Sequence, residues 1–212
     1  MKNVYDLIAE EWNEYKQKPL PAAKMLLTYA VGKTALDCGT GNGRHLPLLV
    51  AKFEQVYAID NSEKLLEIAK KNQAKLTNVH FQLADVGLLP FPEASFDAIL
   101  CAAVLHHLNA DEAVVAFNEL YRVLKPNGLL LGSVWNRHQH RFENIAANEA
   151  NVAWKMKSGK TVPRFVHFFE KREVEQLAAG AGFEIVKTFY ELNGKEHEKN
   201  GAGNLCFVLK KV

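Results

Sequence analysis

The feature that most constrains the fold is a regular alternation, from residue 34 onward, between short apolar or β-branched runs and longer segments of helical periodicity. This alternation is typical of βαβ units, in which helices connect parallel strands. The expected strands are residues 34–38, 55–60, 79–84, 96–102, 128–135, 183–189 and 204–209. The pattern predicts an α/β fold with a doubly wound, mostly parallel seven-stranded sheet and helices on both faces.

Helix boundary signals fit between these strands. Ser62 can cap a helix whose apolar residues share one face, and Asn109 followed by Glu112 resembles a capping box. Gly182 is suited to end a helix over residues 170–181. We therefore expect a helix in each of these connections.

Two segments fall outside the alternation. With 212 residues the chain is best interpreted as one domain, residues 1–212, carrying an N-terminal helical lid over residues 1–32 and an insertion over residues 136–169. Eight Lys or Arg residues against three Glu make the stretch 137–172 more basic than the whole chain, whose net charge is +2. Because additions to a rigid α/β scaffold usually carry specificity, we expect the basic insertion to bind substrate.

Composition narrows the class of protein. Its apolar runs are too short to cross a bilayer, and the N-terminus lacks a signal peptide's order, so we expect a cytoplasmic protein with no membrane partner. Cys38, Cys101 and Cys206 lie in apolar runs without C-x-x-C spacing, and the eight histidines show no metal-ligand spacing. We expect buried cysteines and no metal site.

A glycine-rich turn over residues 37–43 follows the first expected strand. In a Rossmann-like sheet such a turn brings backbone amides close to a ligand. Dinucleotide binding needs G-x-G-x-x-G, but Arg44 stands in the place of the third glycine and the spacing is G-x-G-x-G. The turn therefore favours S-adenosyl-L-methionine over NAD, with Asp37 meeting the cofactor's ammonium group through water.

Two further acids follow the next strands. Asp60 can accept both ribose hydroxyls, and Asp85 can accept from an adenine amino group while Val86 packs on the ring. Any one acid could merely cap a helix or turn, but three at successive strand ends favour a cofactor site. The cofactor-binding residues expected from this pattern are Asp37, Gly39, Thr40, Gly41, Gly43, Asp60, Asn61, Asp85, Val86 and Ala102.

The chain resembles the class I S-adenosylmethionine-dependent methyltransferases over essentially its whole length. Within them it is similar to the tRNA wobble-uridine carboxymethyl methyltransferases, at residues 4–9, 18–21, 89–91, 104–108, 134–136 and 164–168. The resemblance implies methylation of the carboxylate of a 5-carboxymethyl-type uridine in tRNA, a small zinc-binding activator subunit as partner, and Tyr15 as part of a lid over the cofactor. Phe165 and Val166, where the family tends to have tyrosines, and the loosely matching residues 151–154 depart from the pattern.

Candidate catalytic residues follow from this chemistry. A carboxylate with a pKa of about 4 is ionised at pH 7 and needs no general base, so the enzyme has chiefly to position it. His106 and His107 follow the fourth strand, where one can bond the substrate and the other can only pack. Arg164 and His167 could clamp the carboxylate or a neighbouring phosphate, although a solvated loop would use the same residues.

The insertion leaves alternatives open. Trp135, Asn136 and Arg141 are expected to bind substrate, and aromatic residues at 142, 154, 165 and 168 either stack RNA bases or form a small satellite core. A methyltransferase of a small metabolite or lipid precursor would instead have a closed apolar pocket. A non-catalytic subunit would bind the cofactor only to stabilise a partner.

Overall fold

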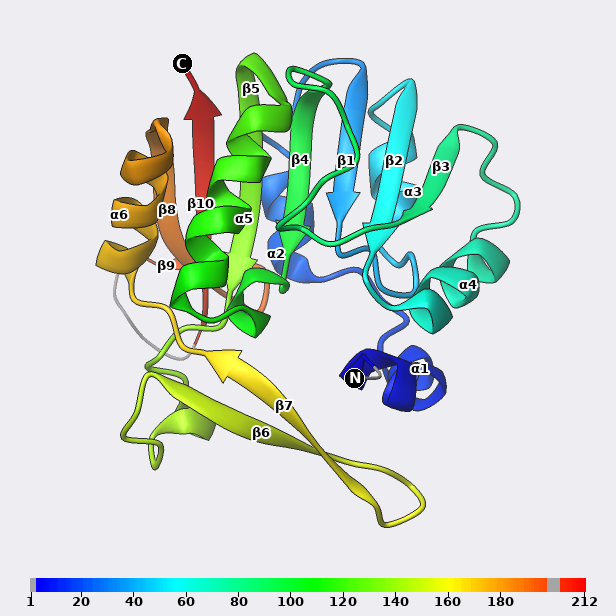
Figure 1. The fold of residues 1–212 in the computed structure, drawn as a ribbon, viewed down its shortest axis with the longest axis vertical. Coiled ribbons are helices and arrows are strands. Elements are labelled where there is room, and N and C mark those ends of the chain that lie inside the picture. The colour runs from blue at the N-terminus through cyan, green and yellow to red at the C-terminus, as the bar shows by residue number, and fades with distance from the viewer. Residues whose placement is uncertain (1–2, 198–202) are drawn as a thin grey trace.

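The computed structural model of the chain describes residues 3–197 and 203–212, so residues 1–2 of the expected lid lie outside the described part. The central sheet has the strand order β3-β2-β1-β4-β5-β10-β8-β9 (Figure 1). Neighbours from β3 to β5 are parallel, whereas β10 runs antiparallel to both β5 and β8. The strands are β1 Thr34–Cys38, β2 Gln55–Asp60, β3 Val79–Leu83, β4 Phe96–Ala102, β5 Leu124–Val134, β8 Phe183–Leu192, β9 Lys195–His197 and β10 Asn204–Lys211. The predicted α/β fold is confirmed.

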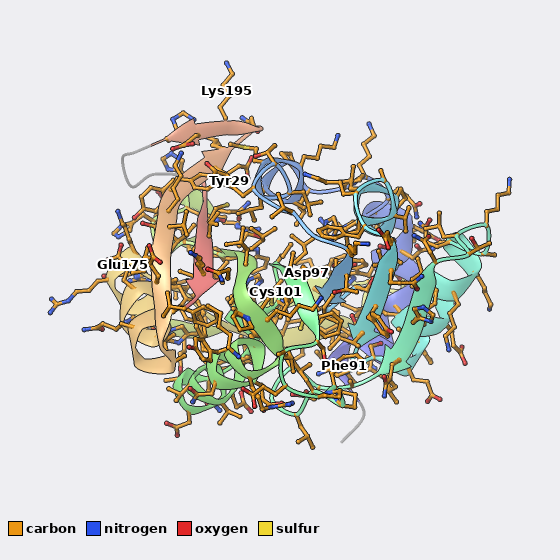
Figure 2. The ribbon with its side chains drawn as sticks, turned by 90° about the horizontal axis from the view of Figure 1, so that it is seen from above. Tyr29, Phe91, Asp97, Cys101, Glu175 and Lys195 are labelled. Atoms are coloured by element: carbon orange, nitrogen blue, oxygen red, sulfur yellow. The ribbon has the colours of Figure 1, made fainter. Side chains whose placement is uncertain are left out.

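Helices cover both faces of the sheet, as Figure 2 shows in the view from above. Leu26 and Leu46, from α2 and α3, belong to the hydrophobic cluster on one face, while Phe117 and Val174, from α5 and α6, belong to the cluster on the other. The helices are α1 Val4–Tyr15, α2 Pro21–Leu26, α3 Leu46–Val50, α4 Glu63–Asn72, α5 Ala110–Val123 and α6 Lys171–Ala181, with short 3-10 turns η1 Leu105–His107 and η2 His140–Phe142. This burial on two faces holds the strand ends in place.

The expected helix boundaries are confirmed. Ser62 accepts a hydrogen bond from the Leu65 amide, and Asn109 and Glu112 form a reciprocal capping box. Gly182 ends α6 in the left-handed conformation at φ +94°. These caps satisfy amides and carbonyls that the helices leave unpaired at their ends.

Within residues 3–197 and 203–212 the sheet has eight strands, where seven were predicted. Asn193 and Gly194 both have positive φ, 54° and 78°, as the two-residue turn of a tight β-hairpin requires. This turn adds the short strand β9 to β8, and the Asn-Gly pair was its signal in the sequence. In addition, β5 begins at Leu124, earlier than expected, and ends at Val134.

The insertion folds as a separate antiparallel hairpin of β6, Glu149–Lys155, and β7, Thr161–His167. Phe142, Val166 and Phe168 are buried together at its base, with Trp135 packed against them. Phe142 and Phe168 therefore form a small satellite core and are not exposed for stacking on RNA bases. Figure 1 shows that the hairpin and α1 both lie beyond the carboxyl ends of the parallel strands.

In the part of the chain that the structure describes, no helix is both long and apolar enough to cross a membrane.

Two glycine substitutions test the packing of the sheet. A Cβ atom at Gly132 on β5 would lie 2.1 Å from the ring of Phe207 on β10, whereas one at Gly180 in α6 would meet nothing within 4 Å. We expect Gly132→Ala to lower the free energy of unfolding by about 1–3 kcal/mol. The matched Gly180→Ala should raise it by roughly 0.5–1 kcal/mol, because alanine favours the helix. Urea unfolding measures both, and equal effects would contradict the packing described.

Candidate cofactor and acceptor site

The main cavity lies at the carboxyl ends of β1, β2 and β4, where the strand order reverses. Ligands of open α/β sheets bind at such a reversal. Its volume is about 500 Å³, and α1 and the β6–β7 hairpin contribute the remaining walls. The expected site residues that line it are Gly39, Thr40, Gly41, Asp60, Asn61, Val86, Ala102, His106, His107, Trp135, Arg141 and Arg164.

The glycine turn is shaped by positive φ angles, 72° at Gly39, 58° at Gly41 and 79° at Gly43. A Cβ atom at Gly39 would lie 2.3 Å from the Val104 side chain, so this position accepts only glycine without displacing its neighbour. The Gly41 amide donates to one oxygen of Asp60 at 2.8 Å, which ties the turn to β2. Backbone therefore forms the floor of the cavity, where a ligand can approach it closely.

Two buried carboxyl groups lie beside this turn. Burial raises the pKa of Asp37 to about 7, although a hydrogen bond from the Thr40 hydroxyl at 2.7 Å opposes the rise. Burial likewise raises the pKa of Asp60 to about 6 against bonds from the backbone amides of Ser62 and Gly41. Both groups would be stabilised as anions by a hydroxyl or ammonium donor from a ligand.

Other expected site residues lie outside the cavity lining: Tyr15, Asp37, Gly43, Asp85, Asn136 and His167. Asp37 lies under the turn, and exposed Asp85 accepts hydrogen bonds from Asn61 at 3.1 Å and the Gly87 amide at 2.8 Å. Tyr15 is 59% exposed and meets the edge of Trp154. Asp85 reaches the cavity only through Asn61, which does line it.

The structure does not bring His167 together with Arg164. The two residues are three apart on β7, and because side chains alternate along a strand, an odd spacing directs them to opposite faces. His167 lies between Glu173, at 2.6 Å, and Glu149, at 3.2 Å, and these carboxylates raise its pKa. It fastens the hairpin to α6 and does not contact the cavity.

Helix α1 supplies cavity residues that the sequence interpretation assigned only to packing or did not single out. Tyr5, Trp12 and Lys16 all line the cavity, and their spacing places them on one face of a helix. The Arg44 guanidinium lies 5.1 Å from the Trp12 ring centroid. Two features of the sequence could have indicated these cavity residues. One is the helical spacing of residues 5, 12 and 16, and the other is the position of Arg44 directly after Gly43.

Four cationic side chains line the cavity: Lys16, Arg44, Arg141 and Arg164. Burial, followed by the charge of Arg164, lowers the pKa of Arg141 to about 10. The pKa of Lys16 is lowered by burial and then by Arg44, Arg141 and Arg164. Among the described lining residues, Asp60 is the one acid, so the cavity favours anionic groups.

Arg164 has an unsatisfied donor. Arg164 is only 8% exposed, and its Nε has no hydrogen-bond partner in the part of the chain that the structure describes. The indole Nε1 of Trp154 is also buried without a partner among the described residues, and the Arg164 guanidinium carbon lies 5.2 Å from the Trp154 ring centroid. A buried donor without an acceptor costs free energy, which an anionic ligand in the cavity would recover.

The two histidines are neutral. His107 donates from Nδ1 to the Phe165 carbonyl at 3.0 Å, so its Nε2 accepts from the Tyr5 hydroxyl at 2.6 Å, and burial lowers its pKa to about 4. His106 accepts from the Trp135 amide at 3.3 Å and stacks on the Trp135 ring, with a pKa that burial holds well below the usual range. At pH 7 both are weak bases.

Helix α1 is anchored over the cavity from two sides. The Lys157 amide at the hairpin tip donates to Glu11 at 3.0 Å, and its ammonium pairs with Glu14. At the other side, the Ser62 hydroxyl donates to Asp6 at 2.6 Å. These contacts tie α1 to the hairpin tip and to the N-terminal end of α4.

Comparison with known proteins agrees with this geometry. Residues 36–132 match the family described as Methyltransferase domain. A tRNA (carboxymethyluridine(34)-5-O)-methyltransferase of Schizosaccharomyces pombe is 28% identical over 216 residues, covering 89% of this chain and 90% of that protein. A demethylmenaquinone methyltransferase of Tropheryma whipplei is 33% identical over 57% of this chain and 49% of its own length.

A solved structure shares the fold. It is a complex between the Haloferax volcanii Trm112 methyltransferase activator and a putative methyltransferase, with a TM-score of 0.73, 17% identity, and coverage of 98% of this chain and 95% of that one. The fold, the matched domain and the relatives identify the protein as an S-adenosylmethionine-dependent methyltransferase of class I architecture. Within that class it resembles the tRNA carboxymethyluridine methyltransferases.

The buried Asp37 predicts a pH dependence of stability. Because its folded pKa of about 7 lies above its ordinary value of 3.8, the folded state binds more protons, and stability falls as pH rises between these values. In cofactor-free protein, Asp37→Asn should remove part of this decline. Thermal unfolding from pH 4.5 to 7.5 measures it, with the exposed Asp111→Asn as control. Parallel pH profiles for wild type and Asp37→Asn would contradict the assignment.

The same group predicts a pH dependence of cofactor binding. If ionised Asp37 meets the cofactor's ammonium through water, affinity for S-adenosylmethionine should increase between pH 6 and 7.5 as the carboxyl ionises. In Asp37→Asn the affinity should be weaker and should rise less over this range, since only Asp60, with a pKa of about 6, still ionises. Calorimetry in buffers of different ionisation enthalpy would detect the released proton, and an Asn variant that releases as much proton as the wild type at pH 7 would argue against Asp37 as the titrating group.

Proposed function

We propose that the protein transfers a methyl group from S-adenosylmethionine to the carboxylate of a 5-carboxymethyl-type uridine at the wobble position of tRNA. The observation that carries this proposal is the buried Arg164, whose Nε lacks a partner in a cavity with three other cations. A carboxylate is the acceptor that such a site accommodates best, because guanidinium binds it in a forked geometry.

The cofactor half of the site uses the glycine turn. The backbone of the turn at residues 39–43 lies against the amino acid part of the ligand, Asp60 accepts from the ribose hydroxyls, and Val86 packs against the adenine. Lys16 and Arg44, which line the cavity near the turn, suit the cofactor's carboxylate. The bound cofactor supplies an electrophilic methyl group on a sulfonium.

The acceptor half positions a nucleophile that is already ionised. Arg141 and Arg164 repel each other, and an anion placed between them would relieve that repulsion. With pKa values held low by burial, His106 and His107 do not act as general bases at pH 7. They hold Trp135 and Tyr5 in place, which orients the walls around the acceptor.

Two observations support an RNA acceptor over a free metabolite. The relative of similar length acts, by its name, on a tRNA carboxymethyluridine. The cavity is lined by cations and opens beside a basic hairpin, where a small-molecule enzyme would be expected to have a closed apolar pocket. The Haloferax complex supports the further proposal that a small activator subunit of the Trm112 kind assists this chain.

The reaction can be tested with radiolabelled cofactor. Purified protein, with and without a Trm112-type subunit, is incubated with tRNA carrying 5-carboxymethyluridine, with unmodified tRNA, and with the free nucleoside. We expect label only in the modified tRNA, and we expect mild alkali to release it as methanol, since a methyl ester hydrolyses while N- or C-methyl groups do not. Alkali-stable label, or label in no RNA, would refute the proposal.

Substitution of Arg164 tests the anion site. Arg164→Leu should lower kcat/KM for modified tRNA by on the order of 100-fold, because a buried charged hydrogen bond is worth several kcal/mol. Arg164→Lys should recover only part of this, because lysine cannot form the fork. The matched control is Lys160→Gln, which removes a charge from the exposed hairpin tip. Cofactor affinity should be unchanged in all three, and a comparable loss in the control would favour general electrostatics.

A further inference from the structure

A chain of hydrogen bonds leads from Arg141 in the cavity wall into the protein. The Arg141 Nε donates to Gln139 Oε1 at 2.7 Å, and Gln139 Nε2 donates to Asn204 Oδ1 at 3.1 Å. Asn204 Nδ2 then donates to Glu191 Oε2 at 3.2 Å. The chain connects η2, the first residue of β10 and the end of β8, which are distant in sequence.

The direction of every bond in this chain is determined. Arg141 can only donate, so the oxygen of the Gln139 amide faces it, and the nitrogen also donates to the Gly203 carbonyl at 3.1 Å. That orientation forces Asn204 to accept with its oxygen and to donate with its nitrogen. The carboxylate of Glu191, which also accepts from the Gly194 amide at 2.7 Å, ends the chain.

The chain joins opposite charges through two neutral amides. Gln139 and Glu191 are 5% and 3% exposed. Among the residues that the structure describes, Arg141 forms no ion pair, while its guanidinium lies 4.0 Å from the Trp135 ring centroid and 4.5 Å from that of Phe142. The positive charge of Arg164 repels the Arg141 guanidinium, so other contacts have to hold Arg141 in this position.

We propose that Glu191, acting through Asn204 and Gln139, positions the Arg141 guanidinium to receive the anionic group of the acceptor. Gln139 and Glu191 are positioning residues, because neither lines the cavity, whereas Asn204 lines it together with Arg141 and links the other two. A neutral relay leaves the positive charge of Arg141 available, whereas a directly paired carboxylate would neutralise it and occupy its donors. The anion role of Arg141 rests on the proposed function, but the restraint of its side chain does not.

The restraint can be measured without any acceptor. Hydrogen exchange at the Arg141 Nε–H, followed by ¹⁵N NMR and assigned from its absence in Arg141→Lys, should be slow in the wild type. Gln139→Leu should accelerate it about tenfold or more, and Glu191→Gln to a smaller extent. Glu196→Gln is the matched control, since Glu196 lies opposite Glu191 in the β8–β9 pair but bonds Lys187 instead. Unchanged exchange in Gln139→Leu would overturn the proposal.

Kinetics on tRNA carrying 5-carboxymethyluridine complete the test. Gln139→Leu and Glu191→Gln should raise the acceptor KM by about 5- to 10-fold, with kcat and the cofactor Kd little changed. Gln139→Glu should not restore KM, because the new carboxylate would pair directly with Arg141 and could not donate to Asn204. In an Arg141→Lys background the same substitutions should add nothing, since residues that act through one side chain are not additive. Additive losses would overturn the relay. If Arg141→Lys itself leaves KM unaltered while exchange responds as expected, the acceptor assignment fails and the restraint stands.

Discussion

The hydrogen bond between the Gly41 amide and the Asp60 carboxylate is the constraint on which the site depends. It joins the turn after β1 to the end of β2, beside the reversal of strand order between β1 and β4. Asp37 pairs with Ala58 in the sheet, and the turn that follows it has positive φ at Gly39, Gly41 and Gly43. The turn backbone consequently lines the cavity beside Asp60, while Asp37 lies under the turn.

The sheet and the two segments added to it, α1 and the β6–β7 hairpin, contribute different parts of the cavity. The sheet edge supplies the glycine turn and Asp60, which suit a cofactor common to many acceptors. Lys16, which follows α1 as its C-cap, and Arg164 on the hairpin both line the cavity, and neither is part of the alternating βαβ pattern. The two additions also contact each other through Glu11 and Lys157.

The cavity's electrostatics favour positioning over acid–base chemistry. Burial drives the pKa values of His106 and His107 away from neutrality and leaves the arginines charged. The Trp135 ring is already engaged by His106 and Arg141, so it supports a guanidinium and is not a free platform for a base. These features suit the positioning of a group that is already ionised better than they suit proton transfer.

The helix caps, the capping box and the glycine turn followed from the sequence alone, because each depends on neighbours within a few residues. Strand ends were predicted less well, since β5 begins at Leu124 and β8 extends to Leu192. The seven-strand expectation failed where the Asn193–Gly194 turn added β9, although that signal was also local. Which polar residues face the cavity was decided by tertiary structure: Arg164 points in and His167 points away because the hairpin's register and twist, set by packing on Phe142 and Phe168, select one face of β7. Glu191 and Gln139 are 52 residues apart in the sequence and come together only because β10 pairs with β8, a long-range contact that no local pattern encodes.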